Sequence, residues 1–263
     1  MAMCVYKPDP GHISAALHSV FAQSCLPDEL ILVIDDCLPS TELLVETIVK
    51  QSHTSIEISV IKNTANLGIA KSRNECISHC GSEYLLFLDQ DDILYPYAFS
   101  IYNLFVSDAS PAILYSTSDL LNNHAGTKTP YMSYLQANIK PTLQNLIRVC
   151  FFPLLSTLIS TACVRKSGVS FSSRYKSVED YDFWLKLLPQ LSADEIVFVP
   201  GPLALYRDHD KNTSSDRLLY HNEHAKLYSS LLLDPLYRDF ASELASLAAK
   251  HVSASNEIIG NNL

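Results

Sequence analysis

Through the first 110 residues, short apolar runs alternate with longer stretches whose apolar residues recur at helical spacing. The short runs predict strands at residues 3–5, 30–34, 56–60 and 84–88. The periodic stretches predict helices near residues 13–21, 43–48 and 69–80. Such alternation favours an α/β fold with a mostly parallel, Rossmann-like central sheet and helices on both faces.

The second half of the chain is less regular. Further strands are expected at residues 112–115 and 196–199. Residues 122–140 are polar and rich in turn formers, as in a loop that covers a site. From residue 216 to about residue 251 the high Leu and Ala content favours helices.

Carboxylates cluster where one of the expected strands ends. The run Tyr-Leu-Leu-Phe-Leu leads directly into Asp89, Asp91 and Asp92. Like charges this close raise one another's pKa unless a cation offsets the repulsion, and Mg²⁺ or Mn²⁺ prefer such oxygen ligands. An isolated D-x-D is a short motif, however, and a solvated acidic turn is the alternative interpretation.

A second acidic pair, Asp35 and Asp36, follows the strand expected at residues 30–34. The carboxyl ends of neighbouring strands in an open α/β sheet border one crevice, where ligands bind. We therefore expect Asp35, Asp36, Asp89 and Asp91 to line a single ligand site, although over fifty positions separate the two pairs.

Two polar clusters later in the chain supply further candidates. Glu179 and Asp180 precede an expected helix, whose dipole favours anions at its amino end. Capping of that helix is the alternative explanation. His209 lies with Arg207 and Asn212 on an irregular segment that suits contact with phosphate or metal, or that is an ordinary surface loop.

The composition limits which partners the protein can bind and the cellular compartment in which it is expected. The chain of 263 residues has a net charge of −9, which argues against nucleic acid because phosphate binding needs clustered Lys and Arg. Its seven cysteines form no C-x-x-C pair, which favours reduced thiols in a cytosolic compartment. Residues 1–10 contain no apolar signal segment.

The most apolar run, residues 149–164, is shorter than the ~20 residues of a membrane-spanning helix and contains Pro153. We interpret it as a buried core segment, with a membrane-dipping acceptor site as the alternative.

Taken in order, these landmarks resemble family 2 glycosyltransferases of the GT-A fold, most of all the bacterial enzymes that build capsule, exopolysaccharide or lipopolysaccharide. The resemblance covers roughly residues 3–215. The matching segments are Val5-Tyr6-Lys7-Pro8, Val33-Ile34-Asp35-Asp36, Asn66-Leu67-Gly68 through Arg73-Asn74, Leu88-Asp89-Gln90-Asp91-Asp92, Glu179 to Leu185, and Tyr206-Arg207 with His209, Asn212 and Ser214. One departure is Cys37-Leu38-Pro39-Ser40, where the family usually has Gly-Ser.

The resemblance implies a metal-assisted, inverting hexosyltransferase-like enzyme. Its donor would be a nucleotide-diphosphate sugar and its acceptor a hydroxyl of a saccharide or lipid-linked saccharide, in bacterial surface polysaccharide synthesis. The implied metal is Mn²⁺ or Mg²⁺. The implied location is the cytoplasm, with peripheral contact at the inner membrane face when the acceptor is lipid-linked.

The resemblance also implies a domain organisation. A GT-A domain would occupy residues 1–215, with a nucleotide-binding half at 1–108 and an acceptor half at 109–215, and a helical extension would occupy residues 216–263.

Residue roles follow from the same resemblance. Asp180 is the candidate general base, with Glu179 as the alternative or as the residue that orients the acceptor. Asp91 is the candidate metal ligand, and Asp89 would contact the ribose or the metal. The other implied donor contacts are Tyr6 and Asp36 at the nucleobase with Asp35 nearby, Arg73 at the base or phosphates, and His209 at the diphosphate or metal.

Two other functions stay open. The segment Asp89 to Leu94 loosely matches the D-x-D-x-[TV]-[LV] motif of haloacid-dehalogenase-type phosphatases, with Asp89 as nucleophile, but that motif normally lies near the start of the chain. A non-catalytic subunit that binds nucleotide-sugar or glycan on the same fold could keep most of these motifs, although the intact acids favour an enzyme.

Overall fold

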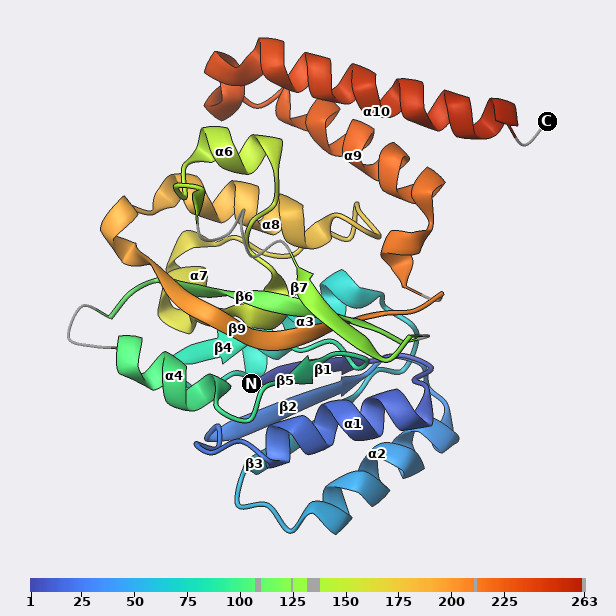
Figure 1. Ribbon diagram of the computed structural model, residues 1–263, viewed down its shortest axis with the longest axis vertical. Coiled ribbons are helices and arrows are strands. Elements are labelled where there is room, and N and C mark those ends of the chain that lie inside the picture. The colour runs from blue at the N-terminus through green and yellow to red at the C-terminus, as the bar shows by residue number, and fades with distance from the viewer. Residues whose placement is uncertain (107–109, 124, 132–137, 211, 262–263) are drawn as a thin grey trace.

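The computed structural model describes residues 1–106, 110–123, 125–131, 138–210 and 212–261 (Figure 1). The strands are β1 (Ala2–Val5), β2 (Glu29–Ile34), β3 (Glu57–Lys62), β4 (Tyr84–Leu86), β5 (Ile93–Leu94), β6 (Ile113–Asn122), β7 (Thr127–Tyr131), β8 (Thr157–Ser160) and β9 (Ile196–Asp208). The helices are α1 (Pro10–Phe21), α2 (Pro39–Ser52), α3 (Ile69–His79), α4 (Ala98–Phe105), α6 (Leu143–Arg148), α7 (Thr161–Ser167), α8 (Glu179–Leu187), α9 (Arg217–Leu231) and α10 (Ala241–Asn261). Short 3₁₀ turns occupy Leu154–Ser156, Leu188–Gln190, Ala193–Glu195, Thr213–Ser215 and Pro235–Phe240.

The first half of the chain forms a parallel sheet of three strands in the order β1-β2-β3. All four residues of β1 and five of the six in β2 are buried, as expected for strands covered on both faces. The register pairs Val5 with Ile34 and Ile34 with Lys62, so the three carboxyl ends are level. The predicted α/β fold class is therefore confirmed, and Tyr6, Asp35 and Asp36 emerge at one edge of the sheet.

The strand expected at residues 84–88 differs in its pairing. β4 lies antiparallel to β8 in a mixed six-stranded sheet of order β4-β8-β6-β9-β5, with β7 paired to β6. Its parallel link to β1 is limited to a bridge from Ala2 to Phe87, beside a bond from the Leu88 N–H to the Ala2 carbonyl at 3.0 Å. An apolar run identifies a buried strand but not the direction of the strand beside it. The neighbour of β4 is β8, which lies roughly seventy residues later in the chain.

The interval 122–140, expected as a loop, contains strand β7, which forms an antiparallel hairpin with β6. The residues of β7 are polar, as in an exposed edge strand. Apolar and polar residues alternate too weakly in it for the sequence to reveal a strand. Residues 124 and 132–137 of this interval lie outside the described part of the chain.

The apolar run 149–164 is part of the core, as interpreted. Phe151 and Phe152 are fully buried, and Phe152 packs against Trp184 of α8, with ring centroids 5.2 Å apart. In the part of the chain that the structure describes, no helix has the length and apolar content needed to span a bilayer.

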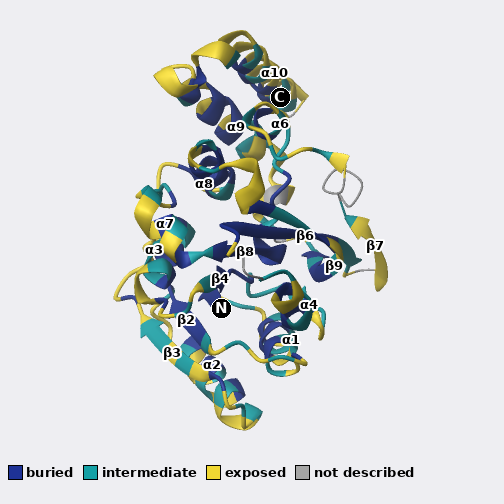
Figure 2. Cartoon of the chain, turned by 90° about the vertical axis from the view of Figure 1, so that its left-hand side faces the viewer, coloured by how far each residue is buried: buried dark blue, intermediate teal, exposed yellow. Residues whose placement is uncertain are grey.

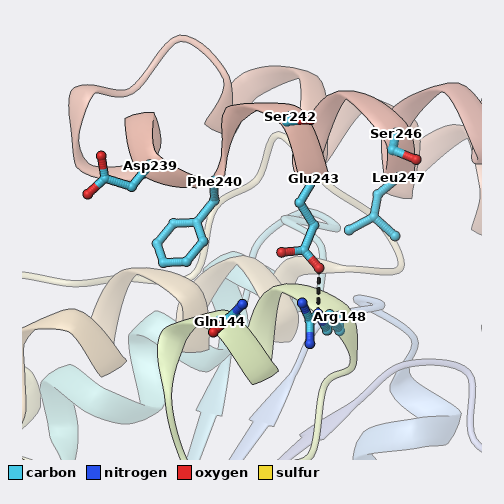
Figure 3. Close-up of a pocket in the computed structure, with 8 residues that line it drawn as sticks. All are labelled: Gln144, Arg148, Asp239, Phe240, Ser242, Glu243, Ser246 and Leu247. Carbon is cyan, nitrogen blue, oxygen red and sulfur yellow. Dashed lines mark hydrogen bonds and ion pairs between the residues drawn. The ribbon is translucent and has the colours of Figure 1, made fainter.

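Helices α9 and α10 pack together beyond α6 and α8, with buried residues on their facing sides (Figures 1 and 2). A hollow of about 570 Å³ lies between α10 and α6, where Arg148 is paired with Glu243 at 2.5 Å (Figure 3). The domain boundary placed at residue 215 remains a prediction.

Three histidines meet between α9 and α10. The Nδ1 atoms of His221 and His251 lie 3.0 Å apart, and the ring of His224 stacks on His251 with centroids 4.8 Å apart. Burial, together with repulsion from His224 and His221, lowers the pKa of His251 to about 4. The folded protein therefore favours neutral His251, whereas the unfolded chain binds a proton near pH 6.5.

We expect His251 to make unfolding depend on pH. Its contribution is complete above about pH 6.5 and falls as the pH drops toward 4, a loss on the order of 2–3 kcal/mol between pH 7 and 4.5. Urea denaturation across that range should give a shallower slope for His251→Phe than for the wild type. The exposed control His79→Phe should keep the wild-type slope; an equal slope for His251→Phe would contradict this prediction.

Candidate active site

Asp35, at the end of β2, supports the loop that leads into α3. It is only 3% exposed, and its carboxylate accepts bonds from the backbone N–H groups of Leu67 and Gly68, both at 2.8 Å. The Asn63 side chain adds a third bond at 2.7 Å. These contacts explain the polar turn at residues 63–68, and they leave Asp35 buried against it rather than exposed at the edge of the sheet.

Asp36, the next residue, faces the crevice side. It accepts bonds from the Thr41 hydroxyl at 2.6 Å and from the Leu38 and Lys7 N–H groups at 3.0 and 2.8 Å. Partial burial alone would raise the pKa of Asp36, but these three bonds hold it below its usual value. Its three donors also line a hollow of about 470 Å³ between the starts of α1 and α2.

The turn after Asp36 accommodates the departure from Gly-Ser. Cys37 takes a left-handed φ of 56°, the conformation a glycine would adopt easily, and its thiol donates to the Asn63 carbonyl at 3.0 Å. Pro39 then begins α2 after Leu38, so neither Ser40 nor Thr41 serves as its N-cap.

The acid cluster after β4 divides into three environments. The Asp89 side chain is 46% exposed, Asp91 is partly buried, and Asp92 is fully buried. Asp92 accepts the backbone N–H of Arg207 at 2.8 Å. Burial, with repulsion from Asp89, raises the pKa of Asp91, and His209 opposes that rise from 2.9 Å.

The end of β9 completes this acid cluster from a distant part of the chain. The Arg207 guanidinium donates to the Asp91 carbonyl at 2.7 Å and to Asn123 at 3.0 Å. Asn212 accepts the His209 N–H at 3.2 Å and donates to the Arg207 carbonyl at 2.8 Å, which fixes the turn that carries His209. The side chain of Ser214 lies outside the described part of the structure.

Arg73 of α3 joins the acid cluster to α8. It is 5% exposed and donates to Glu179 at 2.6 Å and to Asp89 at 3.0 Å. Although burial opposes the charge, the carboxylates of Asp89, Glu179 and Asp180 raise the pKa of Arg73. The guanidinium therefore stays charged between two carboxylates that come from different halves of the chain.

Asp180, at the second position of α8, lies beside this ion-pair network. Burial, and then repulsion from Glu179, raises its pKa to about 7, against the attraction of Arg73. The residue as a whole is partly exposed, and its carboxylate accepts the N–H of Tyr181 in the same helix at 2.7 Å. A carboxyl group that titrates near neutral pH is suited to exchange protons with a ligand.

Sequence reasoning missed two side chains of this site. His12, in the first turn of α1, lies with its ring centroid 5.1 Å from that of His209. Gln90 makes two bonds with the backbone of Tyr6, whose side chain is 41% exposed. No spacing signalled His12, whereas the position of Gln90 between two ligand-type acids could have marked it.

Asp89, Asp91 and His209 are the metal-ligating side chain types at this edge. Among the described residues, no three His, Cys, Asp or Glu side chains converge as a ready metal site. Asp91 and His209 already approach within 2.9 Å, so a cation here would need further oxygen ligands from a bound molecule.

Removal of the Arg73 charge should destabilise the fold strongly. Arg73→Met leaves Glu179 buried without its cation, so we expect a loss of about 3–5 kcal/mol in unfolding free energy by urea denaturation. The matched control is Lys62→Met, which breaks the exposed pairs with Glu42 and Glu46 and should leave the free energy of unfolding close to that of the wild type. Similar losses for the two variants would show that the buried pair is not structural.

Comparison with known proteins identifies the family of this chain. The family model described as Glycosyl transferase family 2 matches residues 2–148. Two uncharacterized glycosyltransferases of Haemophilus influenzae are 25% and 30% identical over 70% and 78% of the chain, which spans 66% of the length of each. The bifunctional glycosyltransferase pgtA of Dictyostelium discoideum is 25% identical over 88% of this chain and 34% of its own.

Solved structures agree with the family match in fold. S. aureus TarS 1–349 in complex with UDP-GlcNAc superposes with a TM-score of 0.70 over 96% of this chain and 71% of that one, at 18% identity. The mannosyltransferase PcManGT from Pyrobaculum calidifontis, in complex with GDP-Man and Mn²⁺, gives 0.69 over 97% and 71%, at 12% identity. The GT-A fold is thereby confirmed, and the chain belongs to glycosyl transferase family 2.

Proposed function

We propose that this chain transfers a sugar from a nucleotide-diphosphate donor to an acceptor hydroxyl, with inversion at the anomeric carbon. One observation carries the proposal: Arg73 holds Asp89 of the acid cluster and Glu179 of α8 in a single ion-pair network, so that Asp180 lies at the same site as the acids. An inverting transfer needs both a site for the leaving diphosphate and a base for the attacking hydroxyl.

The donor's nucleoside is assigned to the edge of the parallel sheet. Asp36 is ionised and beside the 470 Å³ hollow, so it can accept an N–H of a base, while the exposed Tyr6 ring offers a flat apolar face. Binding of UDP-GlcNAc by TarS and of GDP-Man by PcManGT supports a nucleotide-sugar donor. Asp35 is assigned to support of the loop rather than to contact with the base.

The donor's diphosphate is assigned to the acid cluster with Mn²⁺ or Mg²⁺. The residues fit such an ion because Asp91 has a raised pKa that a cation would lower, and because Asp89 is exposed enough to contact it. Asp91, with Asp89 and His209 beside it, would hold the ion. When bound, a divalent ion neutralises charge on the leaving diphosphate.

The proposed base is Asp180. Glu179 has one carboxylate oxygen committed to Arg73, so we assign it the positioning of α8 and the acid cluster. Asp180 accepts the Tyr181 N–H and has a pKa raised to about 7, which suits a group that accepts the proton of an acceptor hydroxyl. The family match argues against the phosphatase alternative.

The acceptor is proposed to be a saccharide, free or lipid-linked, in synthesis of bacterial surface polysaccharide. Support comes from the motif resemblance to such enzymes. A cytoplasmic location with peripheral contact at the inner membrane face belongs to the same proposal.

Donor binding should depend on both a metal ion and Asp91. We expect one of UDP, GDP, TDP or CMP to raise the melting temperature with Mn²⁺ and to have little effect without it, because binding to the folded state alone stabilises it. Asp91→Asn should abolish that rise. As a control, Asp119→Asn removes an acid bonded to Tyr95 at 2.7 Å, outside the cluster, and should keep it. A rise that survives in Asp91→Asn would overturn the metal assignment.

Sugar transfer should require Asp180 in its ionised form. Because its pKa is raised to about 7, the base is lost below that pH, so the transfer rate should rise with pH through about 7 and then level. Asp180→Asn should keep metal-dependent donor binding, lose transfer by roughly 10²–10⁴-fold and lose this pH limb. Near-full transfer in Asp180→Asn would refute the assignment of the base.

A further inference from the structure

Gln90 lies between Asp89 and Asp91 of the acid cluster. Both ends of its side-chain amide bond to the backbone of Tyr6, the residue that follows β1. Its Nε2 donates to the Tyr6 carbonyl and its Oε1 accepts the Tyr6 N–H, each at 2.9 Å. The two residues are 84 positions apart. The Gln90 side-chain amide thus pairs with the N–H and C=O of Tyr6 in the way that the backbone of a neighbouring strand would.

The pair lies where strand pairing between these segments has stopped. The Leu88 N–H bonds to the Ala2 carbonyl, and β1 ends at Val5, whose carbonyl accepts the Asp35 N–H at 2.8 Å. Beyond Val5 the backbone leaves the sheet, and Lys7 takes a φ of 42°. The Gln90 amide therefore satisfies a backbone donor and acceptor that no strand reaches, in a part of the molecule that is partly exposed to solvent.

This contact joins the two halves of the proposed donor site. On one side, Tyr6 is followed by Lys7, whose N–H holds the Asp36 carboxylate at 2.8 Å. On the other side, Gln90 is flanked by Asp89 and Asp91, so any shift of Gln90 moves the acids. The two bonds between the Gln90 side chain and the Tyr6 backbone thus tie the nucleobase contacts directly to the diphosphate contacts.

We propose that Gln90 is a positioning residue that fixes the spacing between the nucleobase half and the diphosphate half of the donor site. The inference rests on the proposed function, because it concerns how one ligand spans both halves. A nucleoside diphosphate has a limited span between base and phosphates, so a site held at the matching distance binds it without ordering two loops. A ligand that occupies only the diphosphate half gains nothing from that spacing.

The test compares ligands that span the site with one that does not. Gln90→Met keeps the length of the side chain and adds no charge, but it removes both bonds. By isothermal titration calorimetry, UDP or GDP with Mg²⁺ should bind about tenfold more weakly to Gln90→Met, the size expected for two hydrogen bonds between neutral groups. Inorganic pyrophosphate with Mg²⁺ should bind equally well to variant and wild type. The control Gln51→Met changes an exposed glutamine in the last turn of α2 and should match the wild type throughout.

Kinetics provide the second readout. With the nucleotide sugar whose nucleotide binds, Gln90→Met should raise KM for the donor about tenfold and leave kcat within about threefold, because Arg73 still holds Asp89 near Asp180 and Arg207 still holds the Asp91 backbone. Unchanged nucleotide affinity and KM would overturn the proposal, as would an equal loss for pyrophosphate, which would make Gln90 a support of the acids alone. If the wild type binds neither nucleotide nor pyrophosphate, the proposed function fails and this inference fails with it. If nucleotide affinity is lost only in Gln90→Met, the proposed function stands.

Discussion

The buried cation of Arg73 is the constraint on which the site depends. Taking a guanidinium out of water is costly unless carboxylates pair with it, and Asp89 and Glu179 each bind one of its two terminal nitrogens. The same geometry leaves Asp180 with only part of that compensation, since Glu179 stands next to it and repels its charge. One buried positive charge therefore fixes the place of α8 and also limits how far burial and Glu179 raise the pKa of Asp180.

A second constraint divides two residues that appear equivalent in the sequence. Asp35 and Asp36 are adjacent, yet successive side chains leaving a strand point to opposite sides. Asp35 is buried and accepts bonds from the Leu67, Gly68 and Asn63 donors, while Asp36 is partly exposed and accepts bonds from residues that line the hollow. The pair combines a structural support and a candidate ligand contact, and loss of either would reduce ligand binding for different reasons.

Much of the first half was predictable because its determinants are local. The apolar runs at residues 3–5, 30–34 and 84–88 mark strands by burial, and the acids that follow the last two lie at the proposed ligand edge. The antiparallel partner of β4 and the ring of His12 against His209 depend on residues far away in the sequence, so periodicity could not predict them. The hairpin of β7 is local, but the exposed, polar strand β7 alternates too weakly to be recognised. Arg73 was recognised as a site residue, but its partners became evident only when α3 and α8 were placed together.

The closure of the acid cluster by β9 bears on how the chain folds as it is synthesised. Asp89, Asp91 and Asp92 emerge from the ribosome well before Arg207 and His209, and before Glu179, which completes the shell around Arg73. Until residue 209 has been added, Asp92 lacks the backbone N–H and Asp91 lacks the imidazole that face them in the finished protein. Docking of β9 should therefore be a late, cooperative step, and a nascent chain halted near residue 148 would carry the acids without a settled site.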